Sequence, residues 1–167
     1  QVGKIGVWEY DIKNDKLIWN EQMFDLYGIT KEEFTGNNNT WINLLDEENK
    51  QAAIEIFNNS LRQNTDYDTE FRIKRKDGEI RHIKALGKIQ FMENQPIKII
   101  GVNWDITEQK KAIERYKAHE ENFNSFFSTI DDMIFIGDKT GKIFYVNGSV
   151  YDKLRYSIEE INLMHIL

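Results

Sequence analysis

The hydrophobic pattern of the chain changes at residues 98–107, from the two-residue period of strands to the seven-residue period of a paired helix. Residues 97–105 are apolar on both faces, which predicts a strand at the centre of a sheet. The positions that follow form a heptad seam that only two polar residues interrupt. The seam consists of Ile106, Gln109, Ile113, Tyr116, Glu120, Phe123, Phe127 and Ile130. We therefore expect a central strand to lead directly into a long helix.

Three residues mark the start of that helix. Asp105 or Thr107 can accept hydrogen bonds from the first helical amides, and Glu108 places negative charge in the first turn. An ordinary capped helix after a sheet edge would have the same features, because caps of this kind are common.

The composition excludes several classes of function. A net charge of −6 lacks the basic surface that nucleic-acid binding requires, so we expect no nucleic-acid partner. The basic cluster Lys74, Arg75 and Lys76 is interpreted as the solvated end of a hairpin and not as a nucleic-acid contact. The absence of cysteine excludes disulfides, thiolate catalysis and cysteine metal sites. No apolar run approaches the roughly twenty residues that cross a bilayer, so we expect no direct membrane contact. Because the sequence begins with Gln1 and stops in an apolar pattern, we expect a piece of a longer protein.

The first third of the chain predicts a hairpin followed by short helices. Residues 6–20 alternate as two strands, with Trp8 and Tyr10 on one face. Asn20 is a candidate cap for a short helix that Gly28 would end in a left-handed turn. A polar loop is expected at 35–39.

A long helix from Asp46 to Asn64 is the clearest prediction, with Ala53, Ile54, Phe57 and Leu61 as its buried stripe. Two alternating strands follow at 67–74 and 80–91. The second strand is predicted to turn Ile83, Ala85, Gly87, Ile89 and Phe91 to one face.

The pattern also suggests where a ligand would lie. Small residues at Ala85 and Gly87 leave room beside the strand, which the long helix or a ligand could fill. Asn103 shares the phase of Ile99 and Gly101, so a polar side chain enters the core from the central strand if that face of the strand is the interior one. Either a neighbour satisfies its hydrogen bonds or a bound molecule does. The candidate pocket residues are Phe57, Phe71, Ile83 and Asn103.

The chain contains an internal repeat. Adding 127 to each position aligns residues 7–34 with 134–161 without a gap, and pairs Asp11 with Asp138, Asn20 with Asn147 and Phe34 with Ile161. A repeat of this kind indicates two copies of one domain, the second cut short before its long helix and last three strands.

Several motifs in this order resemble the PAS domain with its PAC motif, of the type common in sensor histidine kinases and diguanylate cyclases. They are 6–11 (GVWEYD), 19–20 (WN), 26–28 (LYG), 70–73 (EFRI), 76–78 (KDG), Arg81 and 105–108 (DITE). Residues 133–138, 141–142 and 146–147 resemble a second PAS start. The sequence departs from the family pattern at 45–48, where LDEE replaces His-Pro-x-Asp, and at 154–156, where LRY replaces Leu-Gly-Tyr.

This resemblance implies an α+β PAS fold, with a five-stranded antiparallel sheet and helices on one face. It implies a sensor domain at 1–107, a coiled-coil linker helix at 108–130 and a truncated second PAS domain at 131–167. A stimulus would pass through Asp105, Ile106 and Thr107 to the linker helix and a downstream histidine kinase or diguanylate cyclase. Homodimers would form through the helix and the sheet face, in the cytoplasm.

The family's cofactors can be narrowed by the residues that the chain lacks. The flavin adduct of light-oxygen-voltage domains and the chromophore of photoactive yellow protein both need a cysteine, and haem-binding members use a histidine on the long helix. The chain has no cysteine, and its predicted long helix at 46–64 has no histidine. The three histidines, His82, His119 and His165, are too far apart in the sequence to predict a metal site. The core could therefore hold non-covalently bound FAD or a small metabolite, or it could be empty.

A passive spacer with a filled core is the alternative function. We expect no catalysis, because the sequence shows no nucleophile–base set, no recognisable pair of carboxylates and no phosphate-binding loop.

Overall fold

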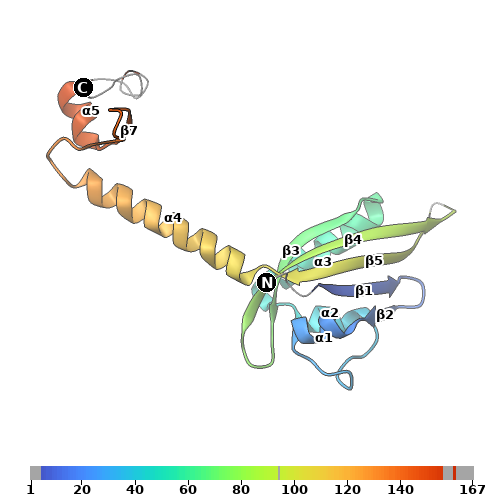
Figure 1. Ribbon diagram of the computed structural model, residues 1–167. Helices are drawn as coiled ribbons and strands as arrows, with labels where there is room; N and C mark the ends of the chain where they lie inside the picture. The colour runs from blue at the N-terminus through green and yellow to red at the C-terminus, as the bar shows by residue number, and fades with distance from the viewer. Residues whose placement is uncertain (1–4, 94, 156–159, 161–167) are drawn as a thin grey trace. The chain divides into compact units, whose positions relative to one another are not determined.

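The computed structural model describes residues 5–93, 95–155 and 160 (Figure 1). The chain divides into two compact units, residues 1–110 and 111–167, which are described separately below. Helix α4 (Thr107–Ser128) begins in the first unit and continues in the second without a break.

The first unit is built on a five-stranded antiparallel sheet with the strand order β2-β1-β5-β4-β3 (Figure 1). The strands are β1 Gly6–Asp11, β2 Lys16–Trp19, β3 Tyr67–Lys74, β4 Ile80–Met92 and β5 Gln95–Asp105. The helices are α1 Glu21–Tyr27, α2 Asn38–Leu44 and α3 Glu47–Gln63, and they share one core with the inner face of the sheet. The predicted α+β fold and the central position of β5 are confirmed.

Local capping accounts for the ends of α1 as predicted. The side chain of Asn20 accepts a hydrogen bond from the amide of Met23. Gly28 takes the left-handed conformation with a φ of 69°, and its amide donates to the carbonyl of Phe24. The hairpin between β3 and β4 also contacts this helix end, where Arg75 donates to the carbonyls of Asp25 and Leu26. The interpretation of residues 74–76 as a solvated hairpin end is therefore wrong for Arg75.

Helix α2 was not predicted, because its Asn-rich start is typical of a loop. Asn37 caps it by accepting from the amide of Asn39, and Trp41 anchors it in the core at 8% exposure. The helix therefore depends on a buried side chain that lies two positions beyond the polar stretch at 35–39.

The inner face of β4 follows the predicted alternation only as far as Ile89. The register between β4 and β5 shifts between Gln90 and Phe91, and Phe91 is 40% exposed. A bulge of this kind turns the following residues away from their expected face, so the prediction that Phe91 lies inside is wrong.

The room beside Gly87 is filled by a neighbouring side chain. Gly87 and Gly101 pair directly across β4 and β5, and the indole of Trp8 covers both. A Cβ atom at Gly101 would lie 2.3 Å from the Trp8 ring, and one at Gly87 would lie 2.9 Å from the side chain of Ile99 and 3.2 Å from the Trp8 ring. Side chains of β1 and β5 therefore occupy the space beside the two glycines.

The outer face of the sheet is more exposed than the apolar pattern of β5 predicts. Ile100 and Leu86 are each 37% exposed, and Val7 and Ile18 are 43% and 47% exposed. The outer side of the sheet thus presents an apolar surface that is partly open to solvent.

The second unit contains the rest of α4, a two-stranded antiparallel sheet of β6 Phe135–Gly137 and β7 Ile143–Val146, and α5 Gly148–Leu154. A small core forms from Ile143, Val146 and Val150. The repeat is confirmed up to residue 155, because β7 and α5 coincide with β2 and α1 after the shift of 127. The predicted match at Ile161 lies outside the described residues, as does His165.

Candidate ligand cavity and signalling joint

A small cavity lies inside the first unit, between the sheet and helices α1 to α3. It is lined by Trp8, Tyr10, Leu17, Trp19, Met23, Tyr27, Asn38, Trp41, Phe57, Tyr67, Phe71, Ala85 and Asn103. The space open to the centre of a water molecule is about 30 Å³, which is room for about two waters.

Three of the four predicted pocket residues line this cavity. Phe57 and Phe71 both contact Trp41, with ring centroids 5.4 and 5.7 Å away. Ile83 is fully buried on the inner face, opposite Phe71 in the pairing of β3 and β4. It is not among the lining residues, because the cavity lies toward the other end of the inner face of β4, beside Ala85.

Asn103 is satisfied by neighbouring side chains. The indole Nε1–H of Trp8 donates to Asn103 Oδ1 at 2.7 Å, and Asn103 Nδ2 donates to the hydroxyl of Tyr27 at 2.8 Å. All three side chains are buried. Neighbouring residues, and not a bound molecule, therefore satisfy the hydrogen bonds of Asn103. The same hydrogen bonds connect β1, β5 and α1.

The tyrosines that line the cavity were missed by the sequence reasoning. Tyr67 shares the alternation of Phe71 and Ile73 along β3, so its inward position could have been predicted. Tyr10 donates to Asp15 at 3.0 Å, and burial raises the pKa of Tyr10 to about 12. Burial also raises the pKa of Tyr27 and of Tyr67. All three hydroxyls are consequently protonated at neutral pH, and the lining carries no charged side chain.

The cavity does not fit the larger cofactors that the family uses. Pockets for drug-sized ligands have volumes of about 300–1,000 Å³, whereas this cavity has about 30 Å³. The aromatic side chains as packed leave no room for the isoalloxazine ring of FAD. Among the residues that the structure describes, no three His, Asp or Glu side chains gather as a metal site.

The predicted joint at Asp105–Thr107 is held by contacts to the neighbouring strand β4. Asp105 accepts from the amide of Thr107 at 2.8 Å, and it pairs with Arg81 at 3.1 Å. The hydroxyl of Thr107 accepts from the amide of His82 at 2.9 Å. Ile106 is 5% exposed, and its amide donates to the carbonyl of His82. The first turn of α4 is thus tied to the sheet.

Lys110 adds a further contact between the first turn of α4 and the sheet, because it pairs with Glu70 on β3 at 2.6 Å. Both side chains are partly exposed, so the pair is screened by solvent and weak. It nevertheless connects α4 to an edge strand that Asp105 does not reach.

In the second unit, Asn147 ties the C-terminal end of α4 to β6 and α5. Its Oδ1 accepts from the amide of Ile134 at 2.9 Å. Its Nδ2 donates to the carbonyls of Phe127, Ile130 and Asp132 at distances of 2.8 to 3.3 Å. The sequence marked Asn147 only as the repeat of Asn20, and did not predict these contacts.

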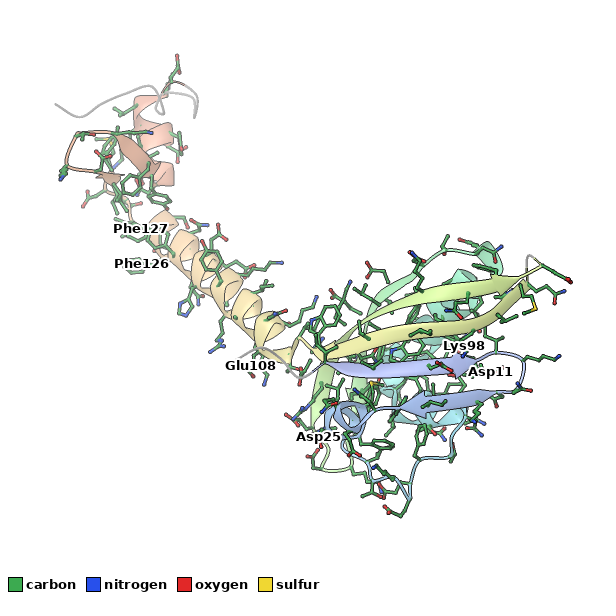
Figure 2. The ribbon with its side chains drawn as sticks, turned by 45° about the vertical axis from the view of Figure 1, so that its right-hand side comes forward. Asp11, Asp25, Lys98, Glu108, Phe126 and Phe127 are labelled. Atoms are coloured by element: carbon green, nitrogen blue, oxygen red, sulfur yellow. The ribbon has the colours of Figure 1, made fainter. Side chains whose placement is uncertain are left out.

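The heptad seam of α4 is largely exposed. Tyr116 is 72% and Ile113 is 53% exposed. Phe123 and Phe127 contact Tyr145 of the second unit, with ring centroids 5.0 and 5.7 Å apart. Figure 2 shows Glu108 at the start of α4, and Phe126 and Phe127 toward its end. No helix of the described residues is long and apolar enough to span a membrane.

Two family profiles match the chain. One, described as PAS fold, matches residues 16–103, and one described as PAS domain matches residues 121–167. The first covers more than half of the chain, and the second overlaps the repeat.

Two curated proteins resemble the chain in sequence. "Probable diguanylate cyclase DgcE" of Escherichia coli is 31% identical over 148 residues, which is 88% of this chain and 13% of that protein. "Hybrid signal transduction histidine kinase I" of Dictyostelium discoideum is 26% identical over 152 residues, which is 89% of this chain and 8% of that protein. The chain therefore spans a small part of both relatives.

Solved structures of sensory domains share the fold. A sensory box histidine kinase/response regulator from Burkholderia thailandensis has a TM-score of 0.62 at 16% identity, over 72% of this chain and 91% of that one. The N-terminal domain of a diguanylate cyclase with PAS/PAC sensor from Marinobacter aquaeolei has a TM-score of 0.60 at 15% identity, over 64% and 99%. The profile matches, the sheet order and these neighbours together show that the chain belongs to the PAS family, with one PAS domain and the start of a second.

Proposed function

We propose that this chain is a sensory and dimerising module of a multidomain signalling protein, which passes a stimulus through α4 to a downstream histidine kinase or diguanylate cyclase. The observation that carries the proposal is the joint between β5 and α4. Asp105 and Thr107 bond to Arg81 and His82 of β4, so a displacement of the central strands would move the base of the helix. The module itself carries no catalytic role in this proposal.

The same proposal divides the chain into a sensor at 1–107, a linker helix at 108–130 and the start of a second PAS domain at 131–167. Homodimers would form through the seam of α4 and the outer face of the sheet. The exposure of Ile113 and Tyr116 supports this arrangement, because apolar side chains at heptad spacing gain free energy when a partner helix covers them. We place the module in the cytoplasm, as the sequence suggested.

Single-cysteine variants test the helix pairing, because the native chain has no cysteine to interfere. Ile113→Cys lies in the seam, and Ala118→Cys lies on the opposite side of the helix as a matched, exposed control. We expect disulfide formation in Ile113→Cys to be several times faster than in Ala118→Cys. Equal rates would contradict pairing along this seam.

A second set of samples tests the relay. Arg81→Gln in the Ile113→Cys background removes the ion pair with Asp105 and leaves the seam intact. We expect the rate of cross-linking to change when this joint is loosened. An unchanged rate at position 113 would indicate that α4 pairs independently of the sheet.

The small volume of the cavity favours a second candidate function, a passive spacer that pairs subunits around a filled core. A spacer and a sensor both predict cross-linking through the seam, but only the sensor predicts that binding in the cavity changes it. Native mass spectrometry of the purified chain would distinguish them, because it reports the number of subunits and any bound mass together.

A further inference from the structure

The hydroxyl of Tyr67 is a buried polar group without a hydrogen-bond partner among the described residues. The side chain is 3% exposed and lines the cavity. Its ring packs edge to face against Trp8 and Phe57, with centroids 6.2 and 5.4 Å away. These contacts fix the ring, so the hydroxyl cannot easily rotate away to reach solvent. A buried hydroxyl without a hydrogen-bond partner lowers the stability of the folded chain. A molecule in the cavity that accepted its hydrogen bond would remove this penalty.

Tyr27 offers a second donor on the same cavity. Its hydroxyl oxygen accepts from Asn103 Nδ2, and this leaves its own proton available for another acceptor. Tyr27 and Tyr67 both line the cavity. Two hydroxyl donors therefore serve one small space.

The walls define the chemistry of an occupant. They are mainly aromatic and carry no charged side chain, so an ionised ligand would lose its hydration without gaining a counter-charge. Neutral donors select for an uncharged molecule with an exposed acceptor atom. The volume of about 30 Å³ limits that molecule to about two to three non-hydrogen atoms, given that a water needs about 10–15 Å³ of such space.

We propose that this cavity binds a small uncharged molecule whose acceptor atom receives a hydrogen bond from Tyr67, with Tyr27 as the second donor. The proposal rests on the proposed sensory function and names the class of its ligand. Two ordered waters are the competing occupant, since they would satisfy the same hydroxyls.

Three probes separate these occupants in titrations of the isotope-labelled full chain followed by NMR. Acetonitrile is a small neutral acceptor, xenon fills apolar space without hydrogen bonding, and acetate is an acceptor of similar size that carries a charge. The test variant is Tyr67→Phe, and Tyr151→Phe is the control, because Tyr151 lies on α5 in the second unit and is not among the residues that line the cavity. Xenon shows whether the cavity is preserved in each variant.

We expect acetonitrile to shift the amide signals of residues around Ala85 and Asn103 in the native chain and in Tyr151→Phe. Its affinity should fall about tenfold in Tyr67→Phe, the loss expected for one hydrogen bond, whereas xenon should bind all three proteins alike. Acetate should shift none of these signals.

Equal acetonitrile affinity in the native chain and Tyr67→Phe would overturn the proposal. Xenon binding without any acetonitrile binding to the native chain would do so as well, and would indicate that the hydroxyls serve waters only. Cross-linking of Ile113→Cys in the same buffer is independent of these titrations. A chain that pairs normally but binds no acetonitrile would therefore refute the ligand and leave the pairing function standing.

Discussion

The two copies of the repeat have the same local geometry but differ in what supports it. In the first copy, the amide of Val7 donates to Asn20 Oδ1 at 3.0 Å, and in the second the amide of Ile134 donates to Asn147 Oδ1 at 2.9 Å. The helix that follows ends in a left-handed residue in both, with a φ of 69° at Gly28 and 59° at Arg155. The asparagine side chain therefore holds the hairpin in both copies, whereas only Asn20 also caps the helix that follows, because the side chain of Asn147 makes no capping hydrogen bond to α5.

The difference lies in the core. The first copy packs on the remaining strands and helices of a complete sheet, whereas the described part of the second has a hydrophobic core of three buried residues, Ile143, Val146 and Val150. Beside this small core, the side-chain nitrogen of Asn147 donates to three carbonyls, one at the end of α4 and two in the segment that follows it, while the corresponding nitrogen of Asn20 donates to Gln22. Local sequence is thus sufficient for the shape of this segment, and long-range packing supplies the free energy that holds it.

The largest expected effect is in the first unit, at Gly101. In Gly101→Ala the added methyl group would lie 2.3 Å from the ring of Trp8 and 2.5 Å from the carbonyl of Leu86. We expect a loss of about 3 kcal/mol in the free energy of unfolding, as for an overpacked core. Urea denaturation followed by tryptophan fluorescence measures it. Gly148→Ala, which meets open space in the second unit, is the control; similar losses in both would contradict the packing account.

Removing the shared asparagine should have the next largest effect. Asn20→Ala removes the cap of α1 and the acceptor for Val7, which should cost about 2 kcal/mol in the free energy of unfolding. Asn147→Ala should increase hydrogen exchange at Ile134 while leaving the first unit unchanged. Unaltered exchange at Ile134 after Asn147→Ala would show that the two residues are not equivalent.

The helix ends predict changes of opposite sign. Gly28→Ala places a side chain at positive φ and against Arg75, so the first unit should lose about 1 kcal/mol of stability. Arg155→Gly relieves the same conformation in the second unit and should stabilise it by up to about 1 kcal/mol. Thermal unfolding of both variants, followed by circular dichroism, provides the test. A loss of stability in Arg155→Gly would indicate that the arginine side chain has a role of its own.

The smallest effect concerns pH and the joint at the start of α4. The hydrogen bond from Lys110 lowers the pKa of Glu70 in the folded chain. The folded state therefore releases this proton more readily than the unfolded state, and the stabilisation is present at neutral pH and lost as the pH falls through the folded-state pKa of Glu70. Lys110→Gln should remove this contribution, which is below about 1 kcal/mol for so exposed a pair. Identical acid-denaturation curves for Lys110→Gln and the native chain would show that the Lys110–Glu70 pair does not contribute to stability.

Features that depend on neighbouring residues were predictable. The cap at Asn20, the turn at Gly28, the alternation of β3 and the helix start at Asp105 each follow from residue types within a few positions of one another. The central position of β5 followed from its apolar residues on both faces. The sequence also placed Asn103 on the same face as Ile99, and the burial of both shows that this face is the interior one.

Features that depend on residues far apart in the sequence could not be predicted from it. Arg75 contacts α1 across about fifty positions of the chain, and Asn103 finds its partners in Trp8 and Tyr27. The bulge after Gln90 turns the side chain of Phe91 to the exposed face of the strand. The buried side chain of Trp41 stabilises a helix in a stretch whose local pattern indicates a loop. The cavity itself arises where side chains from several elements fail to fill the space between them.

The sequence by itself determined the PAS plan, the repeat and the passage from strand to helix, because periodicity and capping are properties of consecutive residues. Only the tertiary structure decided that an indole covers the two paired glycines, that Ile83 lies away from the cavity and that the Tyr67 hydroxyl has no partner. Each of these depends on distances between side chains that the chain brings together only when it folds.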